Sequence, residues 1–475
     1  MSIESYMIAK SQALIEALWE DDILPQLGEY IRIPAKSPHF DPDWQAHGHL
    51  EAAVSLVMTW CQRQPVNGMQ VEVVRLPGRT PVLLLEVTGT APGNILLYGH
   101  LDKQPEMSGW DADKDPWRPV RIDDRLYGRG GADDGYAIFA ALGAIRSLQA
   151  QAQAYPRCVV LIETCEESGS YDLPAYMQAL AERIGEPDLV IALDSGCGTY
   201  DRLWLTTSLR GLAAGDLSVE ILSSGVHSGD AGGIVPSSFR IARLLLERLE
   251  AAADGAIKPA ALHVTIPPER CQQAQAAAQV LGKTAYVRFP WVEGAHPVRQ
   301  NVAELILDRT WRPALEVIGV DGLPDLTRAG NVLRPRTVLR LSVRLPPTFE
   351  AQAALTVLQE TLERDPPYQA RVRFRGAQAS SGWHAPALAP WLENAVICAS
   401  QQAFGAPVAY MGEGGTIPFM AMLGAQFPRA QFLIVGVLGP QANAHGPNEF
   451  LHIPTAKRLT NCVAAVIAAC GQRER

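Results

Sequence analysis

The chain has 475 residues, of which 47% are hydrophobic and 19% are charged, so it is large enough for two or three globular domains. Its formal net charge is −9 at pH 7 and no basic run stands out, which argues against nucleic acid as the main partner. Because no apolar stretch reaches the length that crosses a bilayer, we expect no membrane-spanning segment.

The N-terminus and the cysteines predict a cytoplasmic protein. Residues 1–22 have the pattern of an amphipathic helix with acidic residues inside it, and they lack the basic and apolar regions of a signal peptide. The eight cysteines are scattered and form no Cys-x-x-Cys pair, which suits reduced thiols better than a disulfide framework. Cys165, beside Glu166, is interpreted as a small buried residue rather than a nucleophile.

The first 93 residues are predicted to form helices and two strands. The N-terminal helix is followed by a turn at 32–34, a second helix over 50–63, and strands near 71–74 and 82–87. A glycine-rich segment, 128–135, carries Asp133 and Asp134 and precedes an alanine-rich helix predicted over 135–148.

Four apolar runs are each followed by residues that can bind a metal ion. The runs are 95–98, 159–164, 189–193 and 432–437, and they precede, in turn, His100 with Asp102, Glu166 with Glu167, Asp194, and His445. Near-continuous apolar strands with helices between them predict a largely parallel sheet that is covered on both faces. Since active sites in such sheets lie at the carboxyl ends of the strands, we expect these side chains on one rim.

The pattern changes between about 207 and 383. Residues 217–221 and 339–345 alternate between apolar and polar, and long helices are predicted over 237–251 and 349–364. We therefore predict an α/β protein with a mostly parallel catalytic domain, residues 1–206 and 384–475, and an inserted α+β domain, residues 207–383.

Two imidazoles and several carboxylates at strand ends can build a site for two metal ions. Alternation along an extended chain places Asp102 against one nitrogen of His100 and leaves the other nitrogen for a metal. Each residue alone has a plainer explanation, because a histidine at a strand end is often structural and paired acids often lie on the surface or cap a helix. The joint pattern favours metal binding, since carboxylates that gather without a cation are costly.

The same segments resemble those of the M20 metallopeptidase family, over nearly the whole chain from about residue 25. The motifs that carry the resemblance are His100-x-Asp102, the segment 130–135, the segment 166–169, and Asp194. The family includes carboxypeptidase G, carnosinase-type dipeptidases, acetylornithine deacetylase and succinyl-diaminopimelate desuccinylase.

The resemblance implies a role for each matching residue. His100 and Asp194 would hold one ion, and Glu167 and His445 would hold the other. Asp133 would bridge the two ions, and its peptide bond to Asp134 would be cis. Glu166 would be the general base and Asp102 would orient His100. Nitrogen and oxygen ligands fit two Zn²⁺ ions, with Mn²⁺ or Co²⁺ as alternatives.

The inserted domain resembles the family in further segments. His227, within 225–229, matches a histidine that crosses a homodimer interface and stabilises the oxyanion in the partner's site. Asn331 and Arg344 match positions that contact substrate, and 413–418 matches a Glu-Gly-Gly-Ser-Ile-Pro segment. Through this segment Gly414, Gly415 and Thr416 could bind the substrate's carboxylate. A loop histidine, a solvated strand arginine and a helix-capping turn are the structural alternatives.

Two positions depart from the dipeptidase branch. Gly135 stands where a lysine usually follows the paired aspartates, and Gly412 stands where an arginine usually precedes Glu-Gly-Gly. Both departures concern the substrate rather than the metal ions.

The sequence therefore predicts a two-metal hydrolase that cleaves dipeptides or removes C-terminal residues from short peptides, and that forms a homodimer through the inserted domain. One alternative keeps the site but makes the protein an N-acyl amino acid deacylase or desuccinylase. Another is a non-catalytic binding or scaffold protein on the same fold.

Overall fold

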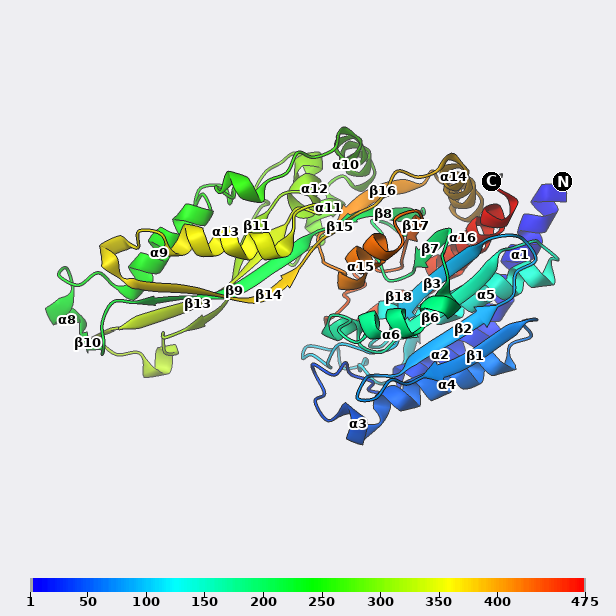
Figure 1. Ribbon diagram of the computed structural model, residues 1–475, viewed down its shortest axis with the longest axis horizontal. Helices are drawn as coiled ribbons and strands as arrows, with labels where there is room; N and C mark the ends of the chain where they lie inside the picture. Colours follow the sequence, from blue (N-terminus) through cyan, green and yellow to red (C-terminus); the bar gives the residue numbers. More distant parts are fainter. Residues whose placement is uncertain (1–2, 474–475) are drawn as a thin grey trace. The chain divides into compact units, whose positions relative to one another are not determined.

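The computed structural model describes residues 3–473 and divides into two compact units (Figure 1). The first two residues of the predicted N-terminal helix lie outside the described residues. The main unit comprises the chain up to Thr206, Ala385–Tyr410, and the chain from Met422 onward. The inserted unit comprises Thr207–His384 and Met411–Ala421. The sequence prediction placed 411–421 in the catalytic domain, whereas in the structure this segment packs with the inserted unit.

The main unit is built on a six-stranded sheet with the order β1-β2-β6-β3-β7-β17. β3 runs parallel to β6 and β7, and β17 runs parallel to β7, which confirms the predicted parallel arrangement of the four apolar runs. β1 and β2 add an antiparallel edge. The strands are β1 (Met69–Val74), β2 (Val82–Val87), β3 (Asn94–His100), β6 (Arg157–Glu163), β7 (Leu189–Ala192) and β17 (Gln431–Ile434).

Both faces of this sheet are buried. Leu97 and Val160 pack in the core with Phe139 of α5, and Leu96 and Val159, which point to the other face, are also fully buried. In the helix layer the ring of Trp60 in α4 meets Phe139 edge-on at 4.6 Å. The helices of this unit are α1 (Ile3–Leu18), α2 (Leu24–Ile31), α3 (Trp44–His47), α4 (His49–Arg63), α5 (Tyr136–Ala150), α6 (Leu173–Ala179), α7 (Ala181–Ile184), α14 (Pro390–Phe404) and α16 (Ile453–Gln472).

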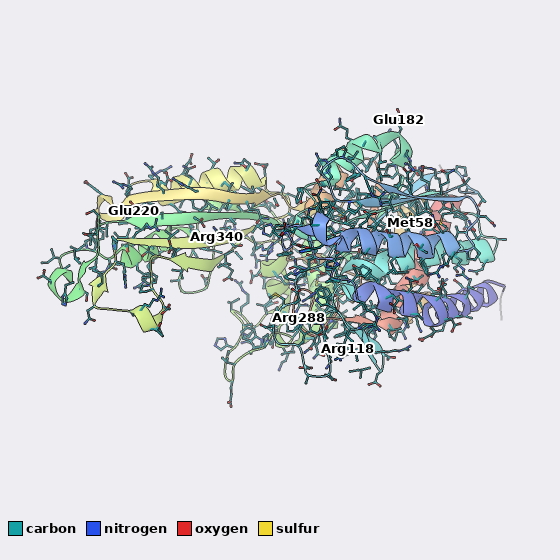
Figure 2. The ribbon with its side chains drawn as sticks, turned by 90° about the horizontal axis from the view of Figure 1, so that it is seen from below. Met58, Arg118, Glu182, Glu220, Arg288 and Arg340 are labelled. Atoms are coloured by element: carbon teal, nitrogen blue, oxygen red, sulfur yellow. The ribbon has the colours of Figure 1, made fainter. Side chains whose placement is uncertain are left out.

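The inserted unit contains a four-stranded antiparallel sheet with the order β11-β13-β9-β14, and α9 and α13 pack on it (Figure 1). The other side carries charged residues such as Arg340, which pairs with Asp216 (Figure 2). Helices on one face of an alternating sheet are the α+β arrangement that the sequence predicted. The strands are β9 (Gly211–Glu220), β10 (Val226–His227), β11 (Ala314–Asp321), β12 (Val332–Leu333), β13 (Arg336–Leu345) and β14 (Arg371–Ser380). The helices are α8 (Ser228–Ala231), α9 (Ser238–Leu249), α10 (Pro268–Leu281), α11 (Thr284–Val287), α12 (Val302–Thr310) and α13 (Ala351–Glu363).

The described residues form three smaller sheets as well. β10 and β12 of the inserted unit form a two-stranded sheet, and two three-stranded sheets have the orders β18-β5-β4 and β15-β8-β16. Their strands are β4 (Val120–Ile122), β5 (Arg125–Tyr127), β8 (Trp204–Leu209), β15 (Trp383–His384), β16 (Ala409–Glu413) and β18 (Phe450–His452), and α15 (Pro418–Gln426) follows β16. Among the helices of the described residues, none combines the length and the apolar content that crossing a bilayer requires.

A buried ion pair joins two distant segments of the main unit. Arg129 and Glu449 are 1% and 0% exposed, and their side chains meet at 2.5 Å. Arg129 also donates to the carbonyl oxygen of Gly446, and the backbone N–H of Gly130 donates to Glu449. The pair therefore fastens the glycine-rich segment before Asp133 to the loop that carries His445.

We expect Arg129→Met to destabilise the main unit by ~3–5 kcal/mol, because it leaves the Glu449 carboxylate buried without its charged partner. Arg75→Met is the matched control, since Arg75 pairs with Glu51 at the surface and such pairs contribute ~1 kcal/mol or less. Urea unfolding of the wild type and the two variants measures the difference in the free energy of unfolding. Equal losses for the two variants would contradict the structural role given to the buried pair.

Candidate active site

Three neighbouring parallel strands end in side chains that can bind metal ions. His100 is the last residue of β3, Asp194 follows β7, and Glu166 and Glu167 follow β6 in a short 3₁₀ turn. Because β6, β3 and β7 lie side by side in the sheet, their carboxyl ends bring these residues to one rim.

Asp133 lies between the two imidazoles. Its Oδ1 atom is 3.4 Å from Nε2 of His100, and its Oδ2 atom is 3.0 Å from Nε2 of His445. The peptide bond between Asp133 and Asp134 is cis, as the family resemblance implied. Each carboxylate oxygen of Asp133 therefore faces a different histidine.

Two groups of potential ligands share this aspartate. The first is His100, Asp133 and Asp194, and the second is Asp133, Glu167 and His445; within each group the ligand atoms lie within 4.8 Å of one another. Nε2 of His100 is 3.8 Å from Asp194, and Nε2 of His445 is 3.4 Å from Glu167. The structure thus brings together the five residues for which the sequence predicted metal binding.

The electrostatics of these residues fit divalent cations. Burial raises the pKa of Asp194 to about 6 and the pKa of Glu167 well above its usual range, and nearby carboxylates add to both shifts. Burial also acts on Asp133, but the nearby imidazoles of His100 and His445 outweigh it and lower the pKa of Asp133. Nε2 of His100 is buried and has no hydrogen-bond partner. A cation at each group would satisfy this nitrogen and balance the crowded carboxylates.

Asp102 differs in detail from the predicted arrangement. Its carboxylate is 3.6 Å from Nδ1 of His100, whereas its backbone carbonyl oxygen is nearer, at 3.0 Å. The carboxylate oxygens accept hydrogen bonds from the backbone N–H groups of Glu166 and Glu167, at 3.1 and 2.9 Å. Asp102 therefore fixes the 3₁₀ turn through its side chain and the ring of His100 mainly through its backbone.

Glu166 lies beside the two groups and belongs to neither. Its Oε2 atom is 4.0 Å from Nε2 of His100, and its side chain is 12% exposed. Burial raises the pKa of Glu166 well above its usual range, and the charge of Asp194 adds to the shift. A carboxylate with a raised pKa can accept a proton near neutral pH.

Two supporting residues had no clear signal in the sequence. Gln104 donates a hydrogen bond of 2.6 Å to Glu167, and its place two residues after Asp102 was the only sign of this role. Glu163 is fully buried beneath the turn and accepts hydrogen bonds from Tyr98 and Ser170, at 2.5 and 2.9 Å. Burial raises the pKa of Glu163 to about 8.

In the inserted unit, Arg344 and the segment 414–416 lie together. Nη1 of Arg344 donates to the hydroxyl of Thr416 at 3.2 Å, and this hydroxyl donates to the carbonyl oxygen of Arg210 at 2.6 Å. Nε of Arg210 donates to the carbonyl oxygen of Gly414. Gly415 is exposed. Arg344 thus presents a guanidinium, and the segment 414–416 presents a hydroxyl and a backbone of small residues. Together these groups suit a carboxylate.

His227 and Asn331 lie at another part of the inserted unit. They belong to the β10 and β12 region, where the backbone N–H of Ser228 donates to the carbonyl oxygen of Asn331. Nδ1 of the exposed His227 accepts from the N–H of Gly229. This region and Arg344 lie at opposite ends of β9. Arg344 pairs with Leu212 near the start of β9, whereas His227 lies beyond Glu220, where β9 ends. Eight residues of strand span roughly 26 Å.

Close packing accounts for both departures from the family motifs. A β-carbon at Gly135 would lie 2.2 Å from the ring of Tyr30, and one at Gly412 would lie 2.4 Å from the hydroxyl of Ser208. Neither position has room for the lysine or the arginine that the family resemblance led us to expect there.

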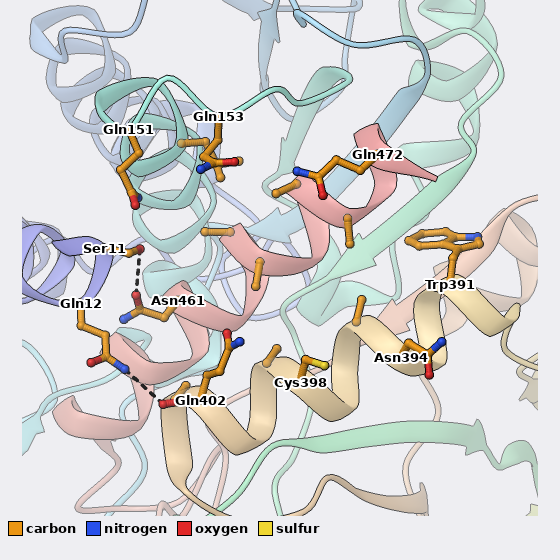
Figure 3. A pocket seen from close by; sticks show the side chains of 18 of the residues that line it. Ser11, Gln12, Gln151, Gln153, Trp391, Asn394, Cys398, Gln402, Asn461 and Gln472 are labelled. Carbon is orange, nitrogen blue, oxygen red and sulfur yellow. Dashed lines mark hydrogen bonds between the residues drawn. The ribbon is translucent and has the colours of Figure 1, made fainter. Parts of the chain in front are cut away.

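A cavity of about 560 Å³ in the main unit lies apart from these residues (Figure 3). It is lined mainly by alanines and side-chain amides of α14 and α16, together with Ser11 and Gln12 of α1, which bond to Asn461 and Gln402. No carboxylate or imidazole is among its described lining residues, so it offers no metal ligands of the predicted kind.

Comparisons with known proteins identify a family and several similar proteins. The model of peptidase family M20/M25/M40 matches residues 96–469. The chain is 27% identical to the cysteinylglycine-S-conjugate dipeptidase of Corynebacterium striatum, over 89% of this chain and 91% of that protein. Among solved structures, the di-peptidase Dug1p of Saccharomyces cerevisiae aligns with a TM-score of 0.78 and 19% identity over 98% of this chain and 99% of that one. Human carnosine dipeptidase 1 aligns with a TM-score of 0.76 and 21% identity, over 98% and 99%.

We expect the protein to bind two divalent ions per chain and Asp133→Asn to lose both, because Asp133 contributes to both ligand groups. Binding should raise the free energy of unfolding by ~3 kcal/mol for each ion at 100 times its Kd. Elemental analysis after dialysis against Zn²⁺, Mn²⁺ or Co²⁺, with thermal unfolding, measures both effects. Asp43→Asn, at an exposed aspartate that makes no capping bond, is the control. Two ions retained by Asp133→Asn would exclude the shared-ligand arrangement.

Proposed function

Because the chain belongs to peptidase family M20/M25/M40, as its motifs predicted, we propose that it is a two-metal dipeptidase. The observation that carries the proposal is Asp133, whose two oxygens face two separate groups of ligands. The dipeptidase from Corynebacterium striatum, which aligns over most of both chains, supports dipeptides as the substrate class. Release of a C-terminal residue from a slightly longer peptide is a variant of the same reaction.

The metal ions would be held by His100 with Asp194, by Glu167 with His445, and by Asp133 between them. When bound, two such ions supply Lewis-acid polarisation of the amide carbonyl and favour ionisation of water. The nitrogen and oxygen donor set suits Zn²⁺, and Mn²⁺ or Co²⁺ are alternatives.

Glu166 would move the proton in the reaction. A water molecule attacks the carbonyl carbon of the amide, and the Glu166 carboxylate accepts the proton that the water loses. The same carboxyl group then gives this proton to the nitrogen of the leaving amine as the carbon–nitrogen bond breaks. Asp102 keeps Glu166 in place through the hydrogen bond to its backbone N–H.

The inserted unit would recognise the C-terminal carboxylate of the substrate. Arg344 offers a planar pair of N–H donors, and the Thr416 hydroxyl, in contact with Arg344, would turn from the carbonyl oxygen of Arg210 to the carboxylate. The small residues Gly414 and Gly415 leave the backbone of this segment accessible to the ligand.

We also propose a homodimer in which His227 serves the partner's site. His227 lies roughly 26 Å along β9 from Arg344, so it is too distant to act on a substrate that Arg344 holds in the same chain. β11 is an edge strand, and Val317, Ile318 and Val320 on it are 47%, 62% and 59% exposed. An exposed apolar edge strand is a surface that commonly pairs with another chain. The eight free cysteines suit a reducing compartment, so we propose a cytoplasmic location.

We expect the metal-loaded enzyme to hydrolyse dipeptides and Glu166→Gln to reduce kcat by ~10²–10⁴-fold without loss of metal, because the proton acceptor is gone. Glu182→Gln, at an exposed glutamate (Figure 2), is the control. The assay compares dipeptides with N-acetyl and N-succinyl amino acids. Cleavage of acylated amino acids alone would make the protein a deacylase, and metal binding without turnover of either class would favour a scaffold protein.

We expect His227→Ala to lose activity while its metal content stays unchanged, and mixing it with Glu166→Gln to restore activity. In a mixed dimer one site combines an intact Glu166 with an intact His227 from the other chain. The two inactive variants are unfolded together, refolded and assayed, and each variant treated alone is the control. Activity that stays at the level of the separate variants would place His227 outside the partner's site.

A further inference from the structure

Three arginines surround the segment 414–416 of the inserted unit. Arg344 reaches it from β13, Arg210 from the junction of β8 and β9, and Arg309 from α12. A β-carbon at Gly414 would lie 3.1 Å from Cγ of Arg309 and 3.3 Å from Nη2 of Arg210, so both side chains pack directly against this glycine.

The described residues provide no carboxylate partner for these three guanidinium groups. Arg210 donates to the carbonyl oxygens of Gly414, Asp308 and Arg312. Burial, together with the charges of Arg344 and Arg309, lowers the pKa of Arg210 to about 9. Positive charges that are gathered in this way call for an anion.

The two acids nearest in sequence do not balance this charge. The Asp308 carboxylate is already paired with Arg299 and Arg312, at 2.8 and 2.7 Å. The charge of Glu413 acts on a fourth arginine, Arg288. Burial and the charge of Arg309 lower the pKa of Arg288, and the charge of Glu413 opposes this shift only in part. The cluster therefore keeps an excess of positive charge.

Arg309 has the most unused hydrogen-bonding capacity of the three. Its one hydrogen-bond partner among the described residues is the thioether sulfur of Met411, at 3.2 Å, and a thioether is a weak acceptor. The donors of Arg210 are directed to backbone carbonyls, and Arg344 is in contact with Thr416. The side chain of Arg309 thus lies between Met411 and Gly414, with most of its donors unused.

We propose that Arg309 forms a second anion contact beside Arg344 and Thr416, and that the preferred substrates end in aspartate or glutamate. This inference rests on the proposed function, in which Arg344 and Thr416 hold the terminal carboxylate. One carboxylate group uses the fork of Arg344 and the hydroxyl of Thr416, so Arg309 remains for the side-chain carboxylate of the same residue.

The test compares Ala-Glu with Ala-Gln, which have nearly the same shape and differ by one charge. We expect the wild-type enzyme to favour Ala-Glu in kcat/KM by about 10- to 100-fold, mainly through KM, since a charge-assisted hydrogen bond is strong. Arg309→Met should bring the ratio of the two substrates close to one, and Arg309→Lys should restore part of it. Arg340→Met is the matched control, because Arg340 pairs with Asp216 on the exposed sheet of the same unit.

A binding measurement separates this inference from the proposed function. Calorimetry with L-glutamate and L-glutamine on the metal-loaded, full-length protein needs no turnover, and wild type should bind glutamate more tightly while Arg309→Met should not. Equal binding of the two amino acids, or an equal loss of both in Arg309→Met, would overturn the inference even if dipeptides are cleaved. Preference for glutamate without cleavage of any peptide would uphold it and count against the dipeptidase.

Discussion

The central constraint on the structure is the repulsion between several carboxylates that are held close together and away from water. Asp133, Glu167, Asp194 and Glu166 gather around His100 and His445, and burial alone raises the pKa of most of these carboxyl groups. Such a group would normally disperse or protonate. Here the sheet, the buried Arg129–Glu449 pair and the hydrogen bonds of Asp102 prevent dispersal. The fold therefore maintains a charge distribution that only bound cations satisfy.

Most of the main unit could be predicted from the sequence because its strands are buried on both faces. Such strands appear as continuous apolar runs, and the parallel order places their carboxyl ends together, so His100, Glu166 and Asp194 could be assigned to one rim. His445 was assigned to the same rim from the apolar run before it, although it follows β17 by a loop rather than ending a strand. Its position depends on Glu449, which contacts a segment more than 300 residues earlier, and no local pattern reports such a contact.

The remaining differences come from packing between segments that are distant in sequence. The carboxylate of Asp102 serves the backbone of Glu166 and Glu167 rather than chiefly His100, because turn geometry decides which donors are in reach. The segment 411–421 groups with the inserted unit because it packs against residues such as Arg210 and Arg309, although it lies well past the insertion in sequence. Arg309 itself is one arginine among many in a helix, and only the three-dimensional structure distinguishes it.

In the proposed function, the main unit carries out catalysis and the inserted unit selects the substrate. The proposed metal ligands are fixed by strand ends and by the buried Arg129–Glu449 pair, so we expect an exchange there to abolish the reaction. The arginines around Gly414 come from β13, α12 and the junction of β8 and β9, so any of these three places can supply a positively charged side chain. The absence of a side chain at position 412, where Ser208 leaves no room, is therefore compatible with the proposed recognition of an anion, because Arg309 of α12 contacts Met411 and Gly414 on either side of that position.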